Sequence, residues 1–157
     1  MSKTTRATQA LAQAGVAFTL RPYDYDPGSE RVGLQAAEAL GENPRRVLKT
    51  LMVEVDGKPG CVVIPSDQEL SMKRVAAAFG GKSAQMMKPP VAERLTGYHV
   101  GGISPFGQKK QVPTAVEETA MGFGQVLING GQRGLLLELA PGDAVKVTKA
   151  VTAALVA

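Results

Sequence analysis

The sequence predicts a single α+β domain over residues 1–157, built on a mixed, mostly antiparallel sheet that curls towards a barrel. Of the 157 residues, 44% are apolar and 20% are charged, which is enough for one buried core without disulfides or metal. Helical and hairpin patterns interleave without the strict strand–helix alternation of a parallel sheet. No repeat, low-complexity tract or linker divides the chain.

The N-terminal part of the chain is expected to contain two helices around one strand. Apolar residues at helical spacing predict a helix over residues 5–14. Alternating apolar residues then predict a strand over 16–20, which Pro22 closes. A second short helix is expected over 32–40 and ends at Gly41.

The clearest local pattern is a β-hairpin. Apolar strands over 48–55 and 61–64 flank a turn that begins at Asp56, followed by glycine, and this dipeptide favours tight hairpin turns. A second hairpin is predicted between strands 125–128 and 135–139, again across a glycine-rich connector.

Three further helices complete the expected elements. One spans 72–79 and one spans 91–95, with a short strand over 83–87 between them. The last helix is expected to begin near Asp143. Its apolar stripe would contain Val147, Val151 and Leu155.

The composition excludes several kinds of site. Eighteen Lys and Arg against fourteen Asp and Glu give a net charge of +4, which is compatible with a polyanionic partner. A single cysteine excludes an intrachain disulfide, and Cys61 with His99 is too few for a zinc site. We therefore expect no metal and no cofactor. Without an apolar run of about 20 residues or a signal core, we expect a cytoplasmic protein that contacts no membrane.

Lys49 is the first candidate for a functional side chain. It has the same strand parity as Leu51, Val53 and Val55, which predicts that it lies on an apolar face. An inward lysine is costly unless it has a partner or a task. Two interpretations stay open: the side chain reaches water from a strand end, or it serves a ligand.

The glycine-rich segment 97–111 is predicted to be an ordered functional loop. Adjacent glycines at Gly101 and Gly102 let a backbone approach a ligand closely and offer its N–H groups to a carbonyl oxygen or an oxyanion. The alternative is an ordinary turn followed by a solvated basic pair, Lys109 and Lys110.

Other chemistry-bearing residues give weaker signals. The turn containing Arg133 is a good hairpin connector on local grounds, although its guanidinium could meet a phosphate. Tyr23 follows the first strand and is either a rim aromatic or a ligand contact. Cys61 and His99 are interpreted as a buried thiol and a plain loop residue in preference to a nucleophile–base pair.

Three strings carry a resemblance to a known family: VLKTLMV at 47–53, TGYHVGGISPFGQKK at 96–110 and GGQRG at 130–134. They closely resemble the YbaK/EbsC family of bacterial aminoacyl-tRNA deacylases, whose best-known members act on Cys-tRNA(Pro). The similarity runs from the first helix to residue 143 and favours the YbaK branch over the related inserted editing domain of prolyl-tRNA synthetase.

The resemblance implies a barrel-like sheet flanked by helices, with a pocket for the aminoacyl-adenosine end. It implies catalytic roles for Lys49 and Tyr23. Residues implied to bind substrate are Thr50, Gly101, Gly102, Ile103, Ser104, Asn129, Gly130, Leu136 and Val32. The basic residues expected to contact tRNA are Lys109, Lys110 and Arg133.

The chain departs from the family pattern at three pocket positions. Leu136 replaces an Asp, Asn129 replaces a Ser, and Val32 replaces a Phe. These departures bear on the amino-acid preference of the pocket. They leave Lys49 and the paired glycines in place.

The family mechanism implied by the resemblance uses the thiol of the substrate's own cysteine to attack its ester carbonyl. Such intramolecular attack gains up to about 7–11 kcal/mol from effective molarity, so the protein needs positioning and oxyanion donors rather than a nucleophile. The implied partners are tRNA and prolyl-tRNA synthetase. The alternatives are a deacylase for Ala or Ser, and a non-catalytic module that binds tRNA or a synthetase.

Overall fold

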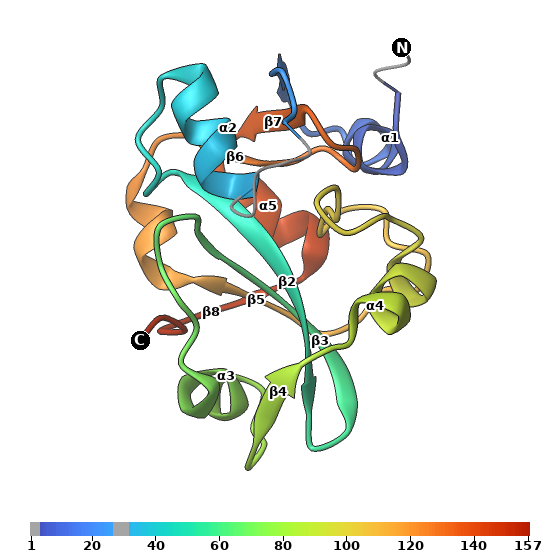
Figure 1. The fold of residues 1–157 in the computed structure, drawn as a ribbon, viewed down its shortest axis with the longest axis vertical. Coiled ribbons are helices and arrows are strands. Elements are labelled where there is room, and N and C mark those ends of the chain that lie inside the picture. The colour runs from blue at the N-terminus through green and yellow to red at the C-terminus, as the bar shows by residue number, and fades with distance from the viewer. Residues whose placement is uncertain (1–3, 27–31) are drawn as a thin grey trace.

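A computed structural model describes residues 4–26 and 32–157, apart from the side chains at 32 and 33. The strands of the described residues form one sheet, and the helices lie around it (Figure 1). In chain order they are α1 (Arg6–Gln13), β1 (Thr19–Pro22), α2 (Val32–Leu40), β2 (Val47–Val55), β3 (Lys58–Pro65), α3 (Met72–Ala78), β4 (Ala84–Met86), α4 (Pro89–Thr96), β5 (Thr114–Glu117), the 3-10 helix η1 (Glu118–Gly122), β6 (Val126–Asn129), β7 (Leu135–Leu139), α5 (Pro141–Thr148) and β8 (Val151–Ala153).

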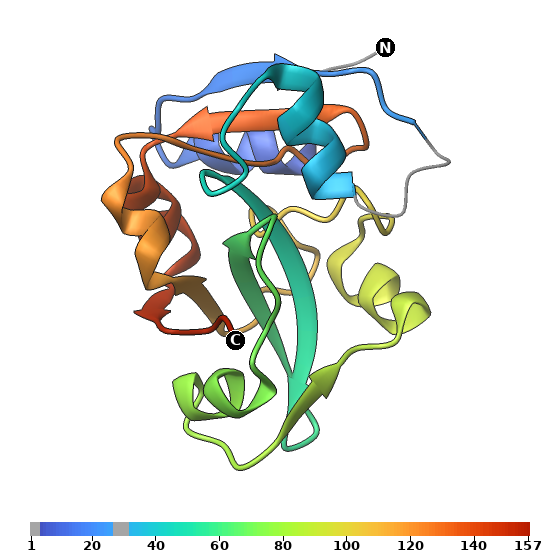
Figure 2. The same ribbon diagram turned by 60° about the vertical axis from the view of Figure 1, so that its left-hand side comes forward.

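The sheet is mixed, as the sequence predicts. Its strand order is β1-β7-β6-β2-β3-β5-β8, and β4 pairs with β2 beside this path. The pairs β2–β6, β3–β5 and β5–β8 are parallel, and the other four described pairs are antiparallel. The sheet curls strongly, so that β1 and β7 run across the direction of β2 (Figure 2). The prediction of an α+β fold with a mixed sheet is confirmed.

The two predicted hairpins form, and the first has the expected turn. Asp56 and Gly57 join β2 to β3 with φ values of 50° and 81°, which is the left-handed pair that a two-residue hairpin turn requires. The carboxylate of Asp56 accepts hydrogen bonds from the backbone N–H groups of Lys82 and Ser83, which ties the turn to the start of β4.

One edge of β2 is left open in its middle, and this opening positions the cavity described below. Along that edge β2 pairs with β6 only through Val47 and Leu48, and with β4 only from Val53 to Val55. Between these pairings, residues 49–52 have no described strand on that edge, although they pair with β3 on the other edge. Helix α4 and the following loop lie across the opening (Figure 1).

Both faces of β2 are apolar. Leu48 and Met52 belong to the largest core cluster, which also contains residues of α1, α4 and α5. Val53 packs on the opposite face with residues of α3, and Val47 packs there with residues of α2. The parity argument for Lys49 therefore did not single out one apolar face, because a central strand is covered on both sides.

The last predicted helix is wrong in its C-terminal half. Helix α5 ends at Thr148, and Lys149 adopts a left-handed conformation with φ 56°. Val151 and Leu155 belong to strand β8 and to the segment after it, where Leu155 is fully buried against α3. Over so few residues, the apolar pattern of a helix cannot be told from that of a strand. Parallel pairing with β5 makes this segment a strand.

Other elements also differ from the sequence prediction. Strand β1 begins at Thr19, three residues after the predicted start, and its last residue Pro22 pairs with Leu135. Proline is tolerated there because β1 is an edge strand. Strand β5 and helix η1 were not predicted, because they follow the loop directly without a turn signal of their own.

Candidate active site

A cavity of about 450 Å³ lies at the open edge of β2. It is bounded by β2 on one side and by α4 with the loop after it on the other. Its polar lining residues are Tyr23, Lys49, Thr50, Ser66, Asp67, Glu69, Gly101 and Asn129. Its apolar lining residues are Leu34, Ala36, Val47, Leu48, Leu51, Met52, Met86, Met87, Pro89, Ala92, Val100, Ile103 and Leu136. A mostly apolar cavity with a few convergent polar groups is typical of a small-molecule or ester site.

Lys49 supplies the only positive charge among the described residues that line the cavity. It is the third residue of β2, stands opposite Ile64 of β3 and is half-buried. Its ammonium makes no hydrogen bond or ion pair with the described residues. The interpretation of Lys49 as a strand-end lysine is therefore not favoured, because the side chain faces a cavity and lacks a protein partner.

Two buried polar atoms beside Lys49 also lack partners. The hydroxyl groups of Thr50 and Tyr23 are buried and make no hydrogen bond among the described residues. Burial raises the pKa of Tyr23, so its hydroxyl stays protonated and can donate a hydrogen bond. Since buried polar groups in native proteins are normally satisfied, these two hydroxyls are candidate contacts for a ligand.

The glycine-rich loop supplies the opposite wall through Gly101 and Ile103. Gly102 and Ser104, which the sequence also assigned to substrate, do not line the cavity. Gly102 packs against the turn between β6 and β7, and its N–H bonds to the carbonyl of His99 at 2.8 Å. Ser104 is fully buried, and its hydroxyl accepts a hydrogen bond from the backbone N–H of Phe106 at 3.2 Å.

The end of β6 and the facing residue of β7 form the floor. Asn129 pairs with Leu136 across the two strands, and both line the cavity. The Asn129 amide donates to the carbonyl oxygen of Gly101 at 3.1 Å. Gly130 does not reach the cavity, because it packs on Leu135. Val32 begins α2, but its side chain lies outside the described residues.

The model of the family described as "Aminoacyl-tRNA editing domain" matches residues 32–147 of this chain, a stretch that contains most of the cavity's lining. The chain belongs to the aminoacyl-tRNA editing domain family. The editing domain thus includes β2, the glycine-rich loop and the β6–β7 hairpin, which together build the cavity.

Relatives of this editing domain are found both as separate proteins and within larger enzymes. The chain is 38% identical over 140 residues to EbsC of Enterococcus faecalis, a candidate Cys-tRNA(Pro)/Cys-tRNA(Cys) deacylase; the match covers 87% of this chain and 84% of EbsC. It is 31% identical over 96 residues to a proline–tRNA ligase of Acidithiobacillus ferrooxidans, covering 61% of this chain and 17% of the ligase.

Two solved structures have the same fold. A candidate trans-editing enzyme for prolyl-tRNA synthetase superposes with a TM-score of 0.86 at 23% identity, covering 100% of this chain and 98% of that one. A protein of hypothetical function superposes with a TM-score of 0.86 at 25% identity, covering 98% and 100%. The whole described fold, and not only the sheet, is therefore shared.

The basic residues assigned to tRNA lie outside the cavity. Lys109 and Lys110 are exposed, and their backbone N–H groups bond to the carbonyls of Thr96 and Leu95 at the end of α4. Arg133 is also exposed, but its guanidinium already donates to the Val100 carbonyl at 2.9 and 2.6 Å. Lys109 and Lys110 remain available to a phosphate, whereas Arg133 is engaged with the protein.

Neither Cys61 nor His99 lines the cavity. Cys61 is fully buried away from the cavity, and burial raises the pKa of its thiol to about 12. His99 is 89% exposed at its side chain and lies 3.6 Å from Glu93. No three described His, Cys, Asp or Glu side chains gather as a metal site, and no helix in the described part of the chain is long and apolar enough to cross a membrane.

Sequence reasoning missed the wall contributed by β4 and α4. Met86 and Met87, with Pro89 and Ala92, line the cavity from that side. Met86 is 47% exposed at the mouth, whereas Met87 is buried. The only local signal was an apolar pair separated by Lys88 from two prolines, because the methionines reach the cavity through the pairing of β4 with β2.

Proposed function

We propose that this editing domain removes the amino acid from mischarged tRNA in trans, and that cysteinyl-tRNA(Pro) is its substrate. The observation that carries the proposal is the Lys49 ammonium, which lines a mostly apolar cavity together with Gly101 and has no partner among the described residues. Membership of the editing family and the likeness to EbsC support the reaction class. The prolyl-tRNA synthetase relatives support the choice of tRNA(Pro).

The proposed reaction needs no protein nucleophile. The thiol sulfur of the substrate cysteine forms a bond to its own ester carbonyl carbon, the bond from that carbon to the tRNA oxygen breaks, and the thiol proton ends on that oxygen. Cysteine leaves as a cyclic thiolactone, which is a lyase-type cleavage. The intramolecular attack profits from effective molarity, and the cavity supplies alignment. Neither Cys61 nor His99 lines the described cavity, so in this route the attacking thiol comes from the substrate.

Each cavity residue has a proposed task in this scheme. The Lys49 ammonium orients the terminal adenosine end, and the hydroxyls of Thr50 and Tyr23 hydrogen-bond to the substrate. The backbone N–H of Gly101 faces the carbonyl oxygen, where negative charge develops as the sulfur–carbon bond forms. Leu136 makes the floor apolar, which favours a small side chain that needs no charged partner.

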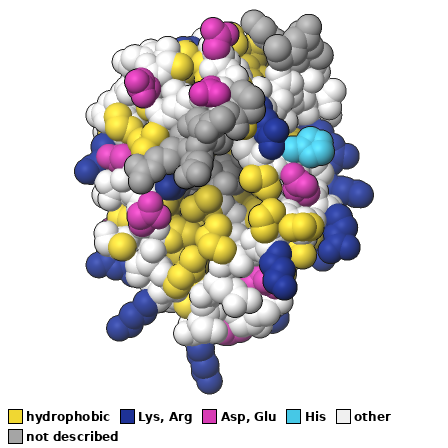
Figure 3. All heavy atoms as spheres, viewed as in Figure 1, with side chains coloured by type: hydrophobic (Ala, Val, Ile, Leu, Met, Phe, Trp, Pro, Cys, Tyr) yellow, Lys and Arg dark blue, Asp and Glu magenta, His cyan; other side chains and the backbone are white. Residues whose placement is uncertain are grey.

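The tRNA body is proposed to approach over α4. Lys and Arg side chains gather along the edge of the molecule that carries the single histidine, beside the apolar mouth of the cavity (Figure 3). Lys109 and Lys110 lie at the end of α4 on this side. Nonspecific phosphate contacts of this kind select tRNA only weakly, so a complex with prolyl-tRNA synthetase in the cytoplasm belongs to the proposal.

The test is a deacylation assay on Cys-tRNA(Pro) and Ala-tRNA(Pro), with the unmodified protein and Lys49→Ala side by side. We expect rapid release of cysteine, little release of alanine, and a loss of about 100-fold or more in Lys49→Ala. Release of a thiolactone, trapped by an added amine, identifies the thiol route.

Two results would contradict the proposal. Equal hydrolysis of both substrates would indicate activated water and a deacylase for Ala or Ser. Binding of tRNA without hydrolysis of either substrate would indicate a non-catalytic module.

A further inference from the structure

The turn between β6 and β7 packs directly on the glycine-rich loop, although the two lie about thirty residues apart in the chain. We define this turn as the brace: residues 130–134 with Asn129 at its start. Its contacts fix a peptide of the loop that faces the cavity.

Arg133 makes the central contact of the brace. Its Nε and Nη2 donate to the carbonyl oxygen of Val100 at 2.9 and 2.6 Å. The guanidinium carbon also lies over the ring of Tyr25, 5.5 Å from the ring centre. A cation–π contact combined with two donors to one acceptor restricts the guanidinium more than a single hydrogen bond does.

Asn129 holds the next carbonyl of the loop. Its amide nitrogen donates to the oxygen of Gly101 at 3.1 Å, while its amide oxygen accepts from the N–H of Gly131 at 2.7 Å. The carbonyls of Val100 and Gly101 are thus both bonded to the brace. Neither residue is free to rotate its peptide without breaking one of these bonds.

The paired glycines fit this contact. Gly101 has φ 91°, and a Cβ atom there would lie 3.0 Å from Nε of Arg133. At Gly102 a Cβ atom would lie 3.0 Å from the backbone nitrogen of Arg133 and 3.1 Å from the backbone of Gln132. A side chain at either position would push the brace away. The glycines therefore serve close packing of protein on protein as well as access to the cavity.

The direction of the Gly101 N–H follows from peptide geometry. In a trans peptide the carbonyl oxygen and the following N–H point in opposite directions. Because Arg133 holds the oxygen of Val100, the N–H of Gly101 points away from Arg133, and it has no hydrogen-bond partner among the described residues. Gly101 lines the cavity.

We propose that Arg133 is a positioning residue, which fixes the Val100–Gly101 peptide so that the Gly101 N–H is presented to the substrate carbonyl. This inference rests on the proposed function. It replaces a phosphate contact as the task of Arg133. A phosphate contact requires only a point charge. The brace requires the two guanidinium donors to Val100 and the contact with the Tyr25 ring.

The kinetic test compares Arg133→Lys and Arg133→Met with Lys73→Met, an exposed cation on α3 away from the cavity. On Cys-tRNA(Pro), we expect kcat to fall about tenfold or more in both Arg133 variants, with KM changed less than about twofold. The slope of log(kcat/KM) against log[salt] stays unchanged, and Lys73→Met behaves as the unmodified protein.

A phosphate contact would give a different pattern, which would overturn the inference. Arg133→Lys would then keep most of the activity. Arg133→Met would raise KM and reduce the salt slope by about 0.7–0.9.

A second measurement without substrate separates this inference from the proposed function. Hydrogen exchange at the Gly102 amide, which bonds to the His99 carbonyl within the loop, is expected to accelerate about tenfold in both Arg133 variants at unchanged thermal stability. If exchange at Gly102 accelerates in the Arg133 variants but the unmodified protein does not hydrolyse Cys-tRNA(Pro), the proposed function is refuted and the positioning role of Arg133 is retained. Unchanged exchange in well-folded variants would refute the brace.

Discussion

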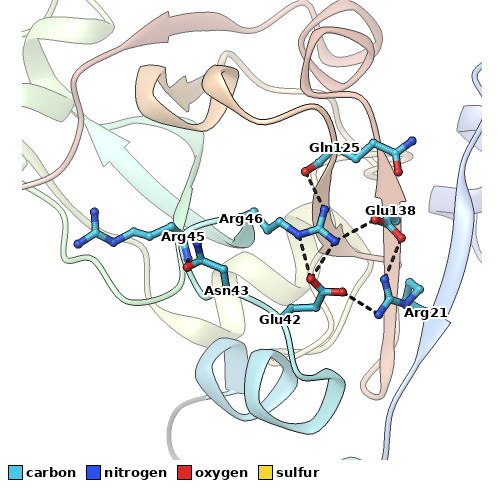
Figure 4. Close-up of polar contacts among 7 residues, drawn as sticks. All are labelled: Arg21, Glu42, Asn43, Arg45, Arg46, Gln125 and Glu138. Atoms are coloured by element: carbon cyan, nitrogen blue, oxygen red, sulfur yellow. Dashed lines mark hydrogen bonds and ion pairs between the residues drawn. The ribbon is translucent and has the colours of Figure 1, made fainter.

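Arg46 and Lys49 lie three residues apart at the start of β2, and they have opposite surroundings. Arg46 donates to Glu42 at 2.9 Å, to Glu138 at 3.0 Å and to the carbonyl of Gln125 at 2.9 Å (Figure 4). Lys49 has no hydrogen-bond or ion-pair partner among the described residues. One cation is thus satisfied by the fold, and the other has no partner in the part of the chain that the structure describes.

The network around Arg46 joins segments that are distant in the chain. Arg21 of β1 bonds to both Glu42 and Glu138, at 3.0 and 2.8 Å, so two arginines and two carboxylates form one closed cluster. Their side chains are 16–25% exposed. Burial alone would raise the pKa values of Glu42 and Glu138, but hydrogen bonds from both arginines lower them overall.

The comparison teaches how to separate structural from functional charge. A partly buried charge with several good partners stabilises the fold when removal of one partner would strand the others. A charge without partners in a cavity costs stability and is explained by a ligand. The predictions that follow test this distinction, beginning with the largest expected effect.

The sharpest test substitutes both cations by the same apolar side chain. Lys49→Met is expected to lower kcat/KM for Cys-tRNA(Pro) about 100-fold or more, and to raise the free energy of unfolding by up to about 1 kcal/mol, because an unpartnered charge is removed. Arg46→Met is expected to lower the free energy of unfolding by about 2 kcal/mol, because it strands Glu42 and Glu138, while the folded protein keeps activity within about threefold. Urea unfolding measures the stability of the two variants, and the deacylation assay measures their activity. Similar losses of stability and of activity in the two variants would contradict the distinction between structural and functional charge.

Glu117, a buried carboxylate outside the network, tests the same distinction through the pH dependence of the free energy of unfolding. Glu117 is 1% exposed and accepts hydrogen bonds from the N–H groups of Leu155 at 2.8 Å and Thr119 at 2.9 Å. Burial raises its pKa, but these hydrogen bonds outweigh burial, so the pKa is lowered overall. Its stabilising contribution is therefore present above the unfolded value of about 4.3 and is lost as pH falls through the folded value.

The matching variant is Glu117→Gln. It keeps the shape but removes the charge, and is expected to lower the free energy of unfolding at pH 7 by about 1–2 kcal/mol. The difference from the unmodified protein should shrink as pH falls below about 4, in urea unfolding at a series of pH values. A difference that does not depend on pH would show that the charge of Glu117 is not what stabilises the C-terminal segment.

The smallest expected effect has the opposite sign. Thr50→Val removes the unpartnered cavity hydroxyl and keeps the side-chain volume, so the free energy of unfolding is expected to rise by about 1 kcal/mol. If that hydroxyl binds substrate, kcat/KM falls about threefold to tenfold. Thermal melting and the same kinetic assay measure the two changes. A variant that is both less stable and fully active would place Thr50 among the structural residues.

Local patterns predicted the elements that depend on neighbouring residues. The Asp56–Gly57 turn, the helix that Ser71 caps, and both hairpins formed where expected, because turn and cap chemistry acts within a few residues. The segment after Thr148 failed, because its strand exists only through parallel pairing with β5, which lies more than thirty residues earlier.

The features of the candidate site also fall into those that the sequence indicated and those that only the tertiary structure decided. By itself, the sequence marked Lys49 and the glycine-rich loop as candidates for the site, since both are short and compositionally unusual. Only the tertiary structure decided that Gly101 and Ile103 face the cavity while Gly102 and Ser104 do not, and that Arg133 bonds to Val100. These facts depend on the direction of each peptide and on the gap beside β2, which long-range pairing creates and no local pattern encodes.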